Sequence, residues 1–122
     1  MDSYPIILSG STHGAPIKVA ATSTPGTTIH TATSSAGNPN YAMDLVTLYV
    51  SNTHTAAVNL TIEYGGTTDP DHLILDAVPI PINTRPIQIC FDFPLRNGLV
   101  IKAFASTANV LLIYGPAVWR VA

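Results

Sequence analysis

Charged residues are scarce in this sequence. Only 10% of its 122 residues are Asp, Glu, Lys or Arg, against roughly 25% in a typical soluble domain. Five basic and seven acidic residues give a net charge of −2, so the chain lacks the cationic field that a nucleic-acid partner requires. We therefore expect no nucleic-acid binding. Because a monomer relies on charged surface for solubility, this composition favours a subunit that buries much of its surface against neighbours.

Cysteine pairs, long apolar runs and a targeting segment are also missing. Cys90 is the only cysteine, so no internal disulfide can form, and its apolar neighbours Ile89 and Phe91 indicate a packing residue and not a reactive thiol. No window has the ~20 consecutive apolar residues of a membrane-spanning helix. The N-terminus is acidic and has only a short apolar stretch, Ile6 to Leu8, unlike a secretory signal peptide. We expect synthesis in a host cytoplasm and no membrane partner.

Helical spacing of apolar residues is absent, and short β-type blocks take its place. In residues 58–64, Val, Leu, Ile and Tyr alternate with Asn, Thr and Glu, which is typical of a half-buried strand. Similar blocks occur at 27–33, 45–50, 73–75, 87–93, 99–105, 110–114 and 117–121. Turn residues separate the blocks. The pattern predicts an all-β fold, an antiparallel β-sandwich of about seven or eight strands that is Ig-like or jelly-roll-like.

The composition changes along the chain and predicts two parts. Residues 1–26 are nearly uncharged, and Pro5, Pro16 and Pro25 exclude a helix there. We expect residues 1–26 to form an extended N-terminal arm and residues 27–122 to form the sandwich domain. Within that domain, Gly and Asn-Pro predict a loop over residues 34–42. The side chains expected to point into its core are those of Val46, Leu48, Val58, Leu60, Ile62, Ile89, Phe91, Ile101, Leu112 and Trp119.

No catalytic or metal-binding pattern stands out. The four histidines do not pair at metal-ligand spacing, and no serine lies in a G-x-S-x-G sequence. We expect neither enzymatic activity nor a cofactor. Asp69 and Asp71 are weak candidates for cation ligands, because Asp-x-Asp in a flexible loop supplies two oxygen ligands. The same Asp-Pro-Asp sequence is also ordinary turn chemistry, which predicts no metal.

Apolar residues in the arm and at the end of the chain are candidates for assembly. Trp119 lies beside Arg120, and its indole could equally well pack against the core, pack in an interface or bind a ligand. An extended arm keeps its backbone groups free for a neighbouring strand edge. The isolated side chains that would seat in pockets between neighbouring subunits are those of Ile6, Ile7, Leu8, Ile17 and Val19. We expect deletion of residues 1–26 to leave the β-domain folded and to weaken its attachment.

Four segments together resemble the small β-sandwich virion structural proteins of tailed bacteriophages. These are residues 44–53, 59–66, 97–105 and 108–110, and the resemblance covers about residues 27–121. The ending, Gly115 to Arg120, departs from the Gly-Tyr-Val-Asn-Arg type of ending in such chains.

This resemblance implies a non-enzymatic capsid cement or decoration protein located in the virion. Its partners would be the major capsid protein or other virion subunits. It would form a homo-oligomer, with a trimer the commonest arrangement in the family. The alternative is a tail or fibre module whose β-sandwich binds a receptor or a carbohydrate.

Overall fold

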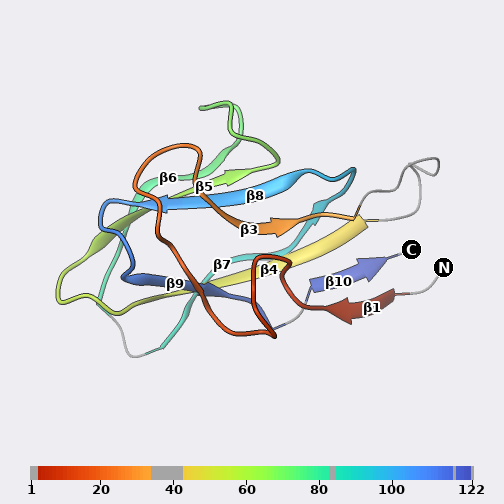
Figure 1. Cartoon of the computed structure of the whole chain (residues 1–122), viewed down its shortest axis with the longest axis horizontal. Coiled ribbons are helices and arrows are strands. Elements are labelled where there is room, and N and C mark those ends of the chain that lie inside the picture. The colour runs from red at the N-terminus through yellow and green to blue at the C-terminus, as the bar shows by residue number, and fades with distance from the viewer. Residues whose placement is uncertain (1–2, 34–42, 83–84, 117, 122) are drawn as a thin grey trace.

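The computed structural model describes residues 3–33, 43–82, 85–116 and 118–121, so the loop predicted at 34–42 lies outside the described residues. The described residues form β-strands and no helix. In chain order the strands are β1 (Ser3–Ile6), β2 (Ile17–Lys18), β3 (Thr27–Thr31), β4 (Met43–Asn52), β5 (Val58–Tyr64), β6 (Leu73–Ile80), β7 (Ile87–Leu95), β8 (Val100–Ala105), β9 (Leu111–Tyr114) and β10 (Val118–Val121). They form two antiparallel sheets that pack on each other as two layers (Figure 1). The predicted all-β sandwich is confirmed.

The six-stranded sheet is organised around β4. One edge of β4 pairs with β7, and the other edge pairs with β10 near the start of β4 and with β9 near its end. The strands β1 and β2 pair in turn with β10 and β9. Across the sheet, β7 is followed by β4. Next come β9 and β10, which pair with different parts of β4, and the last position is taken by β2 beside β9 and β1 beside β10.

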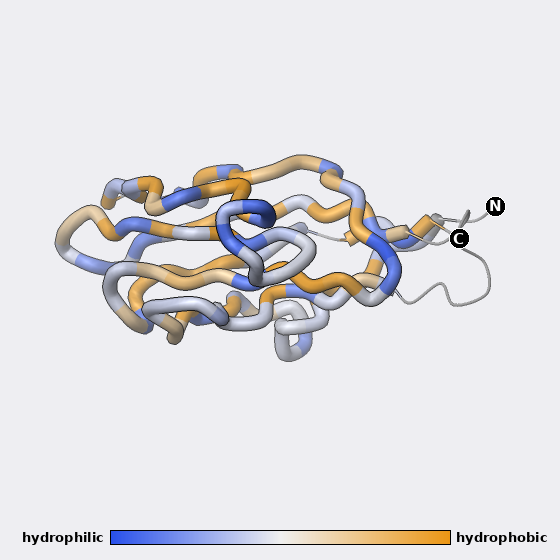
Figure 2. Tube along the Cα trace, turned by 90° about the horizontal axis from the view of Figure 1, so that it is seen from above, coloured by the Kyte–Doolittle hydropathy of each residue, from blue (hydrophilic) through white to orange (hydrophobic). Residues whose placement is uncertain are grey.

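The four-stranded sheet has the order β3-β8-β5-β6. Its β3 edge is accompanied by the chain that follows β1, where the Gly10 N–H donates to the carbonyl of Ile29 (3.0 Å). The β6 edge lies on the opposite side. Seen from above, hydrophobic segments lie along the strands of both layers and alternate with more polar ones (Figure 2), as expected for sheets with one buried face.

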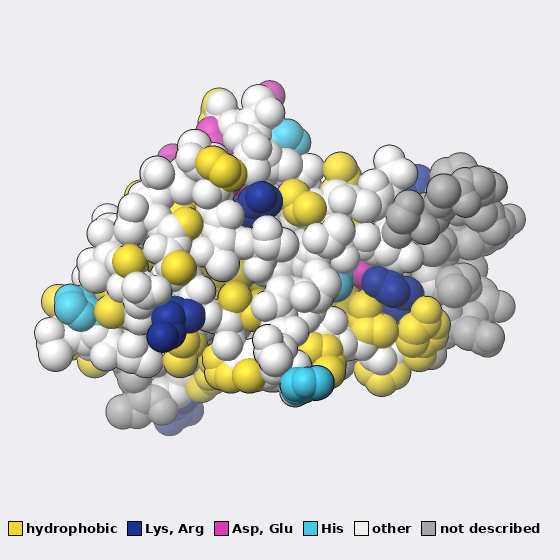
Figure 3. All heavy atoms as spheres, in the orientation of Figure 1, with side chains coloured by type: hydrophobic (Ala, Val, Ile, Leu, Met, Phe, Trp, Pro, Cys, Tyr) yellow, Lys and Arg dark blue, Asp and Glu magenta, His cyan; other side chains and the backbone are white. Residues whose placement is uncertain are grey.

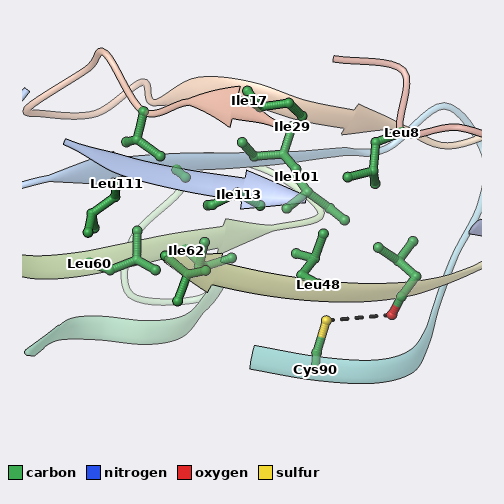
Figure 4. Close-up of a cluster of buried hydrophobic side chains, with 14 of the residues drawn as sticks. Leu8, Ile17, Ile29, Leu48, Leu60, Ile62, Cys90, Ile101, Leu111 and Ile113 are labelled. Carbon is green, nitrogen blue, oxygen red and sulfur yellow. Dashed lines mark hydrogen bonds between the residues drawn. The ribbon is translucent and has the colours of Figure 1, made fainter. Parts of the chain in front are cut away.

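The core lies between the two sheets and is lined by aliphatic side chains from both (Figure 4). The predicted core residues that are confirmed as buried are Val46, Leu48, Val58, Leu60, Ile62 and Ile101. Ile89 is half-buried and packs against this core. The prediction of Leu112 as a core residue is wrong, because in β9 it is Leu111 and Ile113 that point inward.

The prediction that Phe91 and Trp119 point inward is wrong. Phe91 is 65% exposed and Trp119 is 44% exposed. A register shift in β7 breaks the alternation of side chains at Phe91. In β10, Val118 is the buried residue, so its neighbour Trp119 points outward.

The prediction of an arm separate from the sandwich is also wrong. The strands β1 and β2 belong to the six-stranded sheet, so the domain includes residues 3–26. The prolines exclude a helix, but they are compatible with an edge strand, where a missing N–H faces away from the ladder. Pro5 occupies such a position in β1, opposite Trp119 of β10.

Replacing Leu60 by Ala is expected to lower the free energy of unfolding by about 2–5 kcal/mol, because a fully buried side chain leaves a cavity when it is shortened. Urea unfolding followed by tryptophan fluorescence measures this loss. The control is Leu99→Ala, at a leucine that is 45% exposed, where we expect a change of about 0.5 kcal/mol or less. Equal losses in the two variants would contradict the placement of Leu60 in the core.

Candidate functional site

The outer face of the six-stranded sheet is apolar. Along β4, alternate residues from Asp44 to Asn52 are buried, so Leu45 and Tyr49 point away from the core. Cross-strand partners share a face of the sheet, and the register therefore places their partners outward as well. We call this surface the outer face. Its apolar side chains are those of Pro5, Leu45, Tyr49, Pro94, Leu112, Tyr114 and Trp119, and the register also places the polar side chains of Lys18, Ser51 and Gln88 on it.

A row of apolar residues crosses the outer face from edge to edge. Leu45 of β4 lies opposite Pro94 of β7 on one side and opposite Trp119 of β10 on the other. Trp119 in turn lies opposite Pro5 of β1. Over β1 and β10, Figure 3 shows hydrophobic side chains below a basic one. Because an indole presents a large rigid surface at low entropic cost, the exposed Trp119 is the strongest candidate for a contact residue.

The outer face also contains a hollow of about 300 Å³. Two tyrosines, Tyr49 and Tyr114, lie opposite each other in the register and line it together with Pro86, Gly115 and Pro116. The hydroxyl of Tyr114 lies 3.2 Å from the Ser51 hydroxyl. Such a hollow offers aromatic surface for stacking and hydroxyl groups for hydrogen bonds.

Charge is sparse on the outer face and lies at its edges. Lys18 of β2 is opposite Leu112 and therefore faces outward at one edge. At the other edge, the Asp92 carboxylate accepts a long hydrogen bond from the Thr47 hydroxyl (3.5 Å). A partner can therefore cover the apolar area between them without removing a charge from water. Removing a charge from water has a high free-energy cost, which disfavours the burial of charged surface.

The predicted anchoring residues do not act as one set. Leu8, Ile17 and Val19 are buried at 4%, 7% and 0% exposure. They pack in the core of their own domain, so they are not free to enter pockets on a neighbour. Ile6 is half-buried against the same core, whereas Ile7 is 54% exposed. Of the predicted assembly residues, Ile7 and Trp119 remain available to a partner.

The loop before β6 contains the predicted cation ligands. Asp69 and Asp71 are exposed. Desolvation and a side-chain hydrogen bond with Glu63 raise the pKa of Asp69 above its ordinary value. Glu63 is fully buried, and its carboxylate also accepts a hydrogen bond from the Thr24 hydroxyl (2.7 Å). Within the described ranges, no three residues among His, Cys, Asp and Glu are grouped so that they could hold a metal ion.

A buried ionic network closes one end of the sandwich, and the sequence pattern gave no sign of it. His30 of β3 and Asp44 of β4 are both fully buried, with His30 Nε2 at 2.7 Å from Asp44 Oδ2. Arg120 of β10, directly opposite Asp44, donates to both carboxylate oxygens at 2.8 and 3.0 Å. The Ser9 N–H donates to His30 Nδ1 (3.0 Å), so Nδ1 accepts and Nε2 is the ring nitrogen that donates to Asp44.

This network has the chemistry of a structural link. Burial alone would raise the pKa of Asp44, but the hydrogen bonds from Arg120 and His30 hold it below the ordinary value of 3.8. The described residues offer no Ser or Cys nucleophile hydrogen-bonded to His30, since its ring nitrogens are occupied by Asp44 and the Ser9 backbone. The network ties the N-terminal segment, both sheets and the last strand together.

Cys90 is confirmed as a packing residue. It is buried, and its thiol donates to the carbonyl of Val46 (3.5 Å; Figure 4). Desolvation by burial raises the pKa of Cys90 to about 11. The thiolate form, which is the nucleophile, is therefore rare near neutral pH.

Comparison with known proteins returned no match among family models, curated proteins or solved structures. The described residues also contain no helix long and apolar enough to cross a membrane.

Proposed function

We propose that this chain is a non-enzymatic virion structural protein of a tailed bacteriophage, a capsid cement or decoration protein that binds the shell through its outer face. The observation that carries the proposal is the apolar outer face, which leaves Trp119 44% exposed in a small domain with few charges. The partner would be the major capsid protein or another virion subunit, and the chain would be located in the virion. The resemblance of the strand and turn segments to such proteins supports the same conclusion.

The physical chemistry of the outer face suits a permanent contact. The centres of stable interfaces are depleted in charged residues and enriched in aromatic ones. The outer face has this composition, with Tyr49, Tyr114 and Trp119 inside and its charges at the edges. A large exposed apolar surface on a lone domain would promote aggregation, so a covering partner accounts for it.

The contact proposed here differs from the arm contact expected from the sequence. Because Leu8, Ile17 and Val19 are in the core, the N-terminal segment contributes to shell binding only through exposed residues such as Ile7. The trimer implied by the resemblance is not tested by the structure, and it is an alternative to the two-fold pairing proposed in the next subsection.

A second candidate is a tail or fibre module that binds a receptor or a carbohydrate. It is favoured by the hollow beside Tyr49 and Tyr114, since sugar rings stack on aromatic side chains. A glycan array separates the two functions. Glycan binding that is lost in Trp119→Ala or Tyr114→Ala would select this second function over cement.

The cement function is tested by adding the purified chain to phage particles that lack it. Trp119→Asp places a charge at the centre of the proposed contact and is expected to weaken particle binding about 30-fold or more, as for other buried aromatic contact residues. The measurement is a binding isotherm from co-sedimentation with particles. The matched control is Leu99→Asp, because Leu99 is 45% exposed and precedes β8 in the other sheet. Unchanged binding by Trp119→Asp would contradict a contact through the outer face.

A further inference from the structure

The edge strand β7 contains an irregularity with a defined construction. Between the pairs that Val46 and Leu48 make with β7, the register shifts so that Phe91 and Asp92 together oppose Thr47. Asp92 has a φ of 52°, and its N–H donates to the Thr47 hydroxyl at 3.0 Å. This is a β-bulge in which a threonine from the neighbouring strand accepts the backbone hydrogen bond.

The edge strand β6 of the other sheet contains the same construction. Here Asp76 and Ala77 together oppose Thr61 of β5. Ala77 has a φ of 50°, and its N–H donates to the Thr61 hydroxyl, again at 3.0 Å. Two residues beyond each left-handed residue comes a proline, Pro79 in β6 and Pro94 in β7. The strand pairs β5–β6 and β4–β7 are therefore equivalent units, one in each sheet.

A comparison of the two bulges shows that neither depends on one type of side chain at the position before the left-handed residue. Phe91 in β7 occupies the position of Asp76 in β6, so the bulge forms with an aromatic or a carboxylate there. Phe91 is nevertheless 65% exposed, the highest value among the exposed large hydrophobic side chains of the described residues. The bulge therefore does not require a phenylalanine at this position, and the exposed ring is available to a partner.

The two bulged strands lie on the same side of the sandwich. Each forms an outer edge of its own sheet, opposite the side that β3 and the N-terminal segment occupy. Tyr64 at the end of β5 bridges the layers there, because its hydroxyl donates to the carbonyl of Phe93 in β7 (2.9 Å) and the two rings are 5.9 Å apart. The edges of β6 and β7 thus border one lateral surface, which we call the bulged side.

Charges on the bulged side are divided between its two edges. The β6 edge and the loop before it carry Asp69, Asp71 and Asp76, all exposed, and Figure 3 shows carboxylates above β5 and β6. Exposed arginines, Arg85 and Arg96, flank the two ends of β7. Within the described ranges neither arginine forms an ion pair. The β6 edge is acidic, whereas the β7 edge carries one exposed carboxylate, Asp92, and ends in two cations without an ion pair in the described ranges.

We propose that two copies of this chain pair through their bulged sides about a two-fold axis that runs along the strands. In this arrangement the β6 edge of each copy faces the β7 edge of the other. A two-fold axis that lies in the plane of the bulged side and crosses the strands at right angles would instead place β6 against β6, with carboxylates facing carboxylates, which is unfavourable. Opposite charges therefore select one of the two pairings.

The contact is made by side chains and not by a continuous sheet. The bulges interrupt both edges, which hinders strand addition. Phe91 packs instead on the exposed Ile74 and Val78 of the other copy's β6, which are 36% and 37% exposed. Arg96 follows the end of β7, and the loop that contains Asp71 follows the end of β5. These two ends lie at the same end of the sandwich, because the Tyr64 hydroxyl at the end of β5 donates to the carbonyl of Phe93 near the end of β7. The two-fold axis brings Arg96 of each copy to Asp71 of the other.

Sedimentation equilibrium of the purified full chain tests this pairing. We expect a dimer that Phe91→Asp weakens about 30-fold, the effect of losing a central aromatic contact. The bulge should accept this change, since Asp76 occupies the equivalent position, and a thermal melt verifies folding. The matched control is Trp119→Asp, which changes an exposed aromatic residue on the outer face and should leave the dimer intact.

A charge exchange gives a second readout that does not depend on Phe91. Arg96→Asp should weaken the dimer a few-fold, and adding Asp71→Arg to it should restore the affinity, because the opposite charges then face each other again. A monomer or a trimer in the unsubstituted chain would overturn the proposal. So would a dimer that survives Phe91→Asp, or one that Arg96→Asp weakens without restoration by Asp71→Arg. These outcomes concern the isolated protein, so they are independent of whether it is a virion component.

Discussion

A chain that lacks residues 1–26 is expected to be unfolded or to melt far below the full-length protein. The deletion removes β1 and β2 and three core side chains, those of Leu8, Ile17 and Val19. Burying each such side chain contributes about 1.5–3 kcal/mol. Together that is about 4.5–9 kcal/mol, comparable with the whole stability of 5–15 kcal/mol that is typical of a domain. Circular dichroism during a thermal melt measures the result.

The deletion also removes the polar partners of two buried groups. The Ser9 N–H is lost from His30, and the Thr24 hydroxyl is lost from the Glu63 carboxylate. Thr22→Ala, at an exposed position of the same segment, is the control and should melt as the full chain does. A truncated chain that melts within a few degrees of the full chain would restore the interpretation of this segment as a separate arm.

Replacing Asp44 by Ala is expected to lower the free energy of unfolding by about 3–5 kcal/mol. The change leaves Arg120 and the buried His30 without their shared partner, and breaking a buried ion pair from one side has a cost of this size. Guanidinium unfolding measures it. The control is Asp71→Ala, at an exposed aspartate, and we expect a change of about 0.5 kcal/mol or less.

The same carboxylate makes stability depend on pH in a defined direction. The pKa of Asp44 in the folded protein lies below its ordinary value of 3.8. The unfolded state therefore takes up the proton first, so this contribution is fully present above that value and is lost as the pH falls toward the lowered pKa. An Asp44→Asn variant should lack this part of the acid dependence. Parallel curves of stability against pH for the two proteins would contradict the role assigned to Asp44.

The sandwich is predictable from the sequence because its central strands follow a simple period. Residues 58–64 alternate between apolar and polar, and they form β5 with Leu60 and Ile62 buried as expected. The expectation that the strand is half-buried is wrong, because Thr61 and Glu63 on its polar face are buried as well. The edge strands do not follow this period. In β7 the bulge at Phe91 and Asp92 shifts the alternation, so a strict period of two places Phe91 in the core when it is in fact exposed.

The N-terminal segment was mispredicted because proline indicates only which structures are excluded. A proline in an edge strand breaks no ladder bond, and isolated apolar residues such as Val19 fill a core as well as dense blocks do. The pairing of β1 and β2 with the last strands joins residues about a hundred positions apart, and no local pattern encodes it.

The candidate site depended on contacts of the same long range. The outer face combines Leu45, Tyr49 and Trp119 from strands far apart in the chain, and its orientation follows from register. The network of His30, Asp44 and Arg120 likewise joins three strands from two sheets. Its members have no characteristic spacing in sequence, so only the fold brings them together.

The most direct test of the central claim is the copy number of this chain in purified phage particles. Quantitative mass spectrometry of gradient-purified, salt-washed particles measures its ratio to the major capsid protein. The proposed cement function predicts a fixed ratio that is the same in every preparation, with the chain retained through the wash. Absence of the chain from washed particles, or a few copies located only on tails, would contradict the cement function.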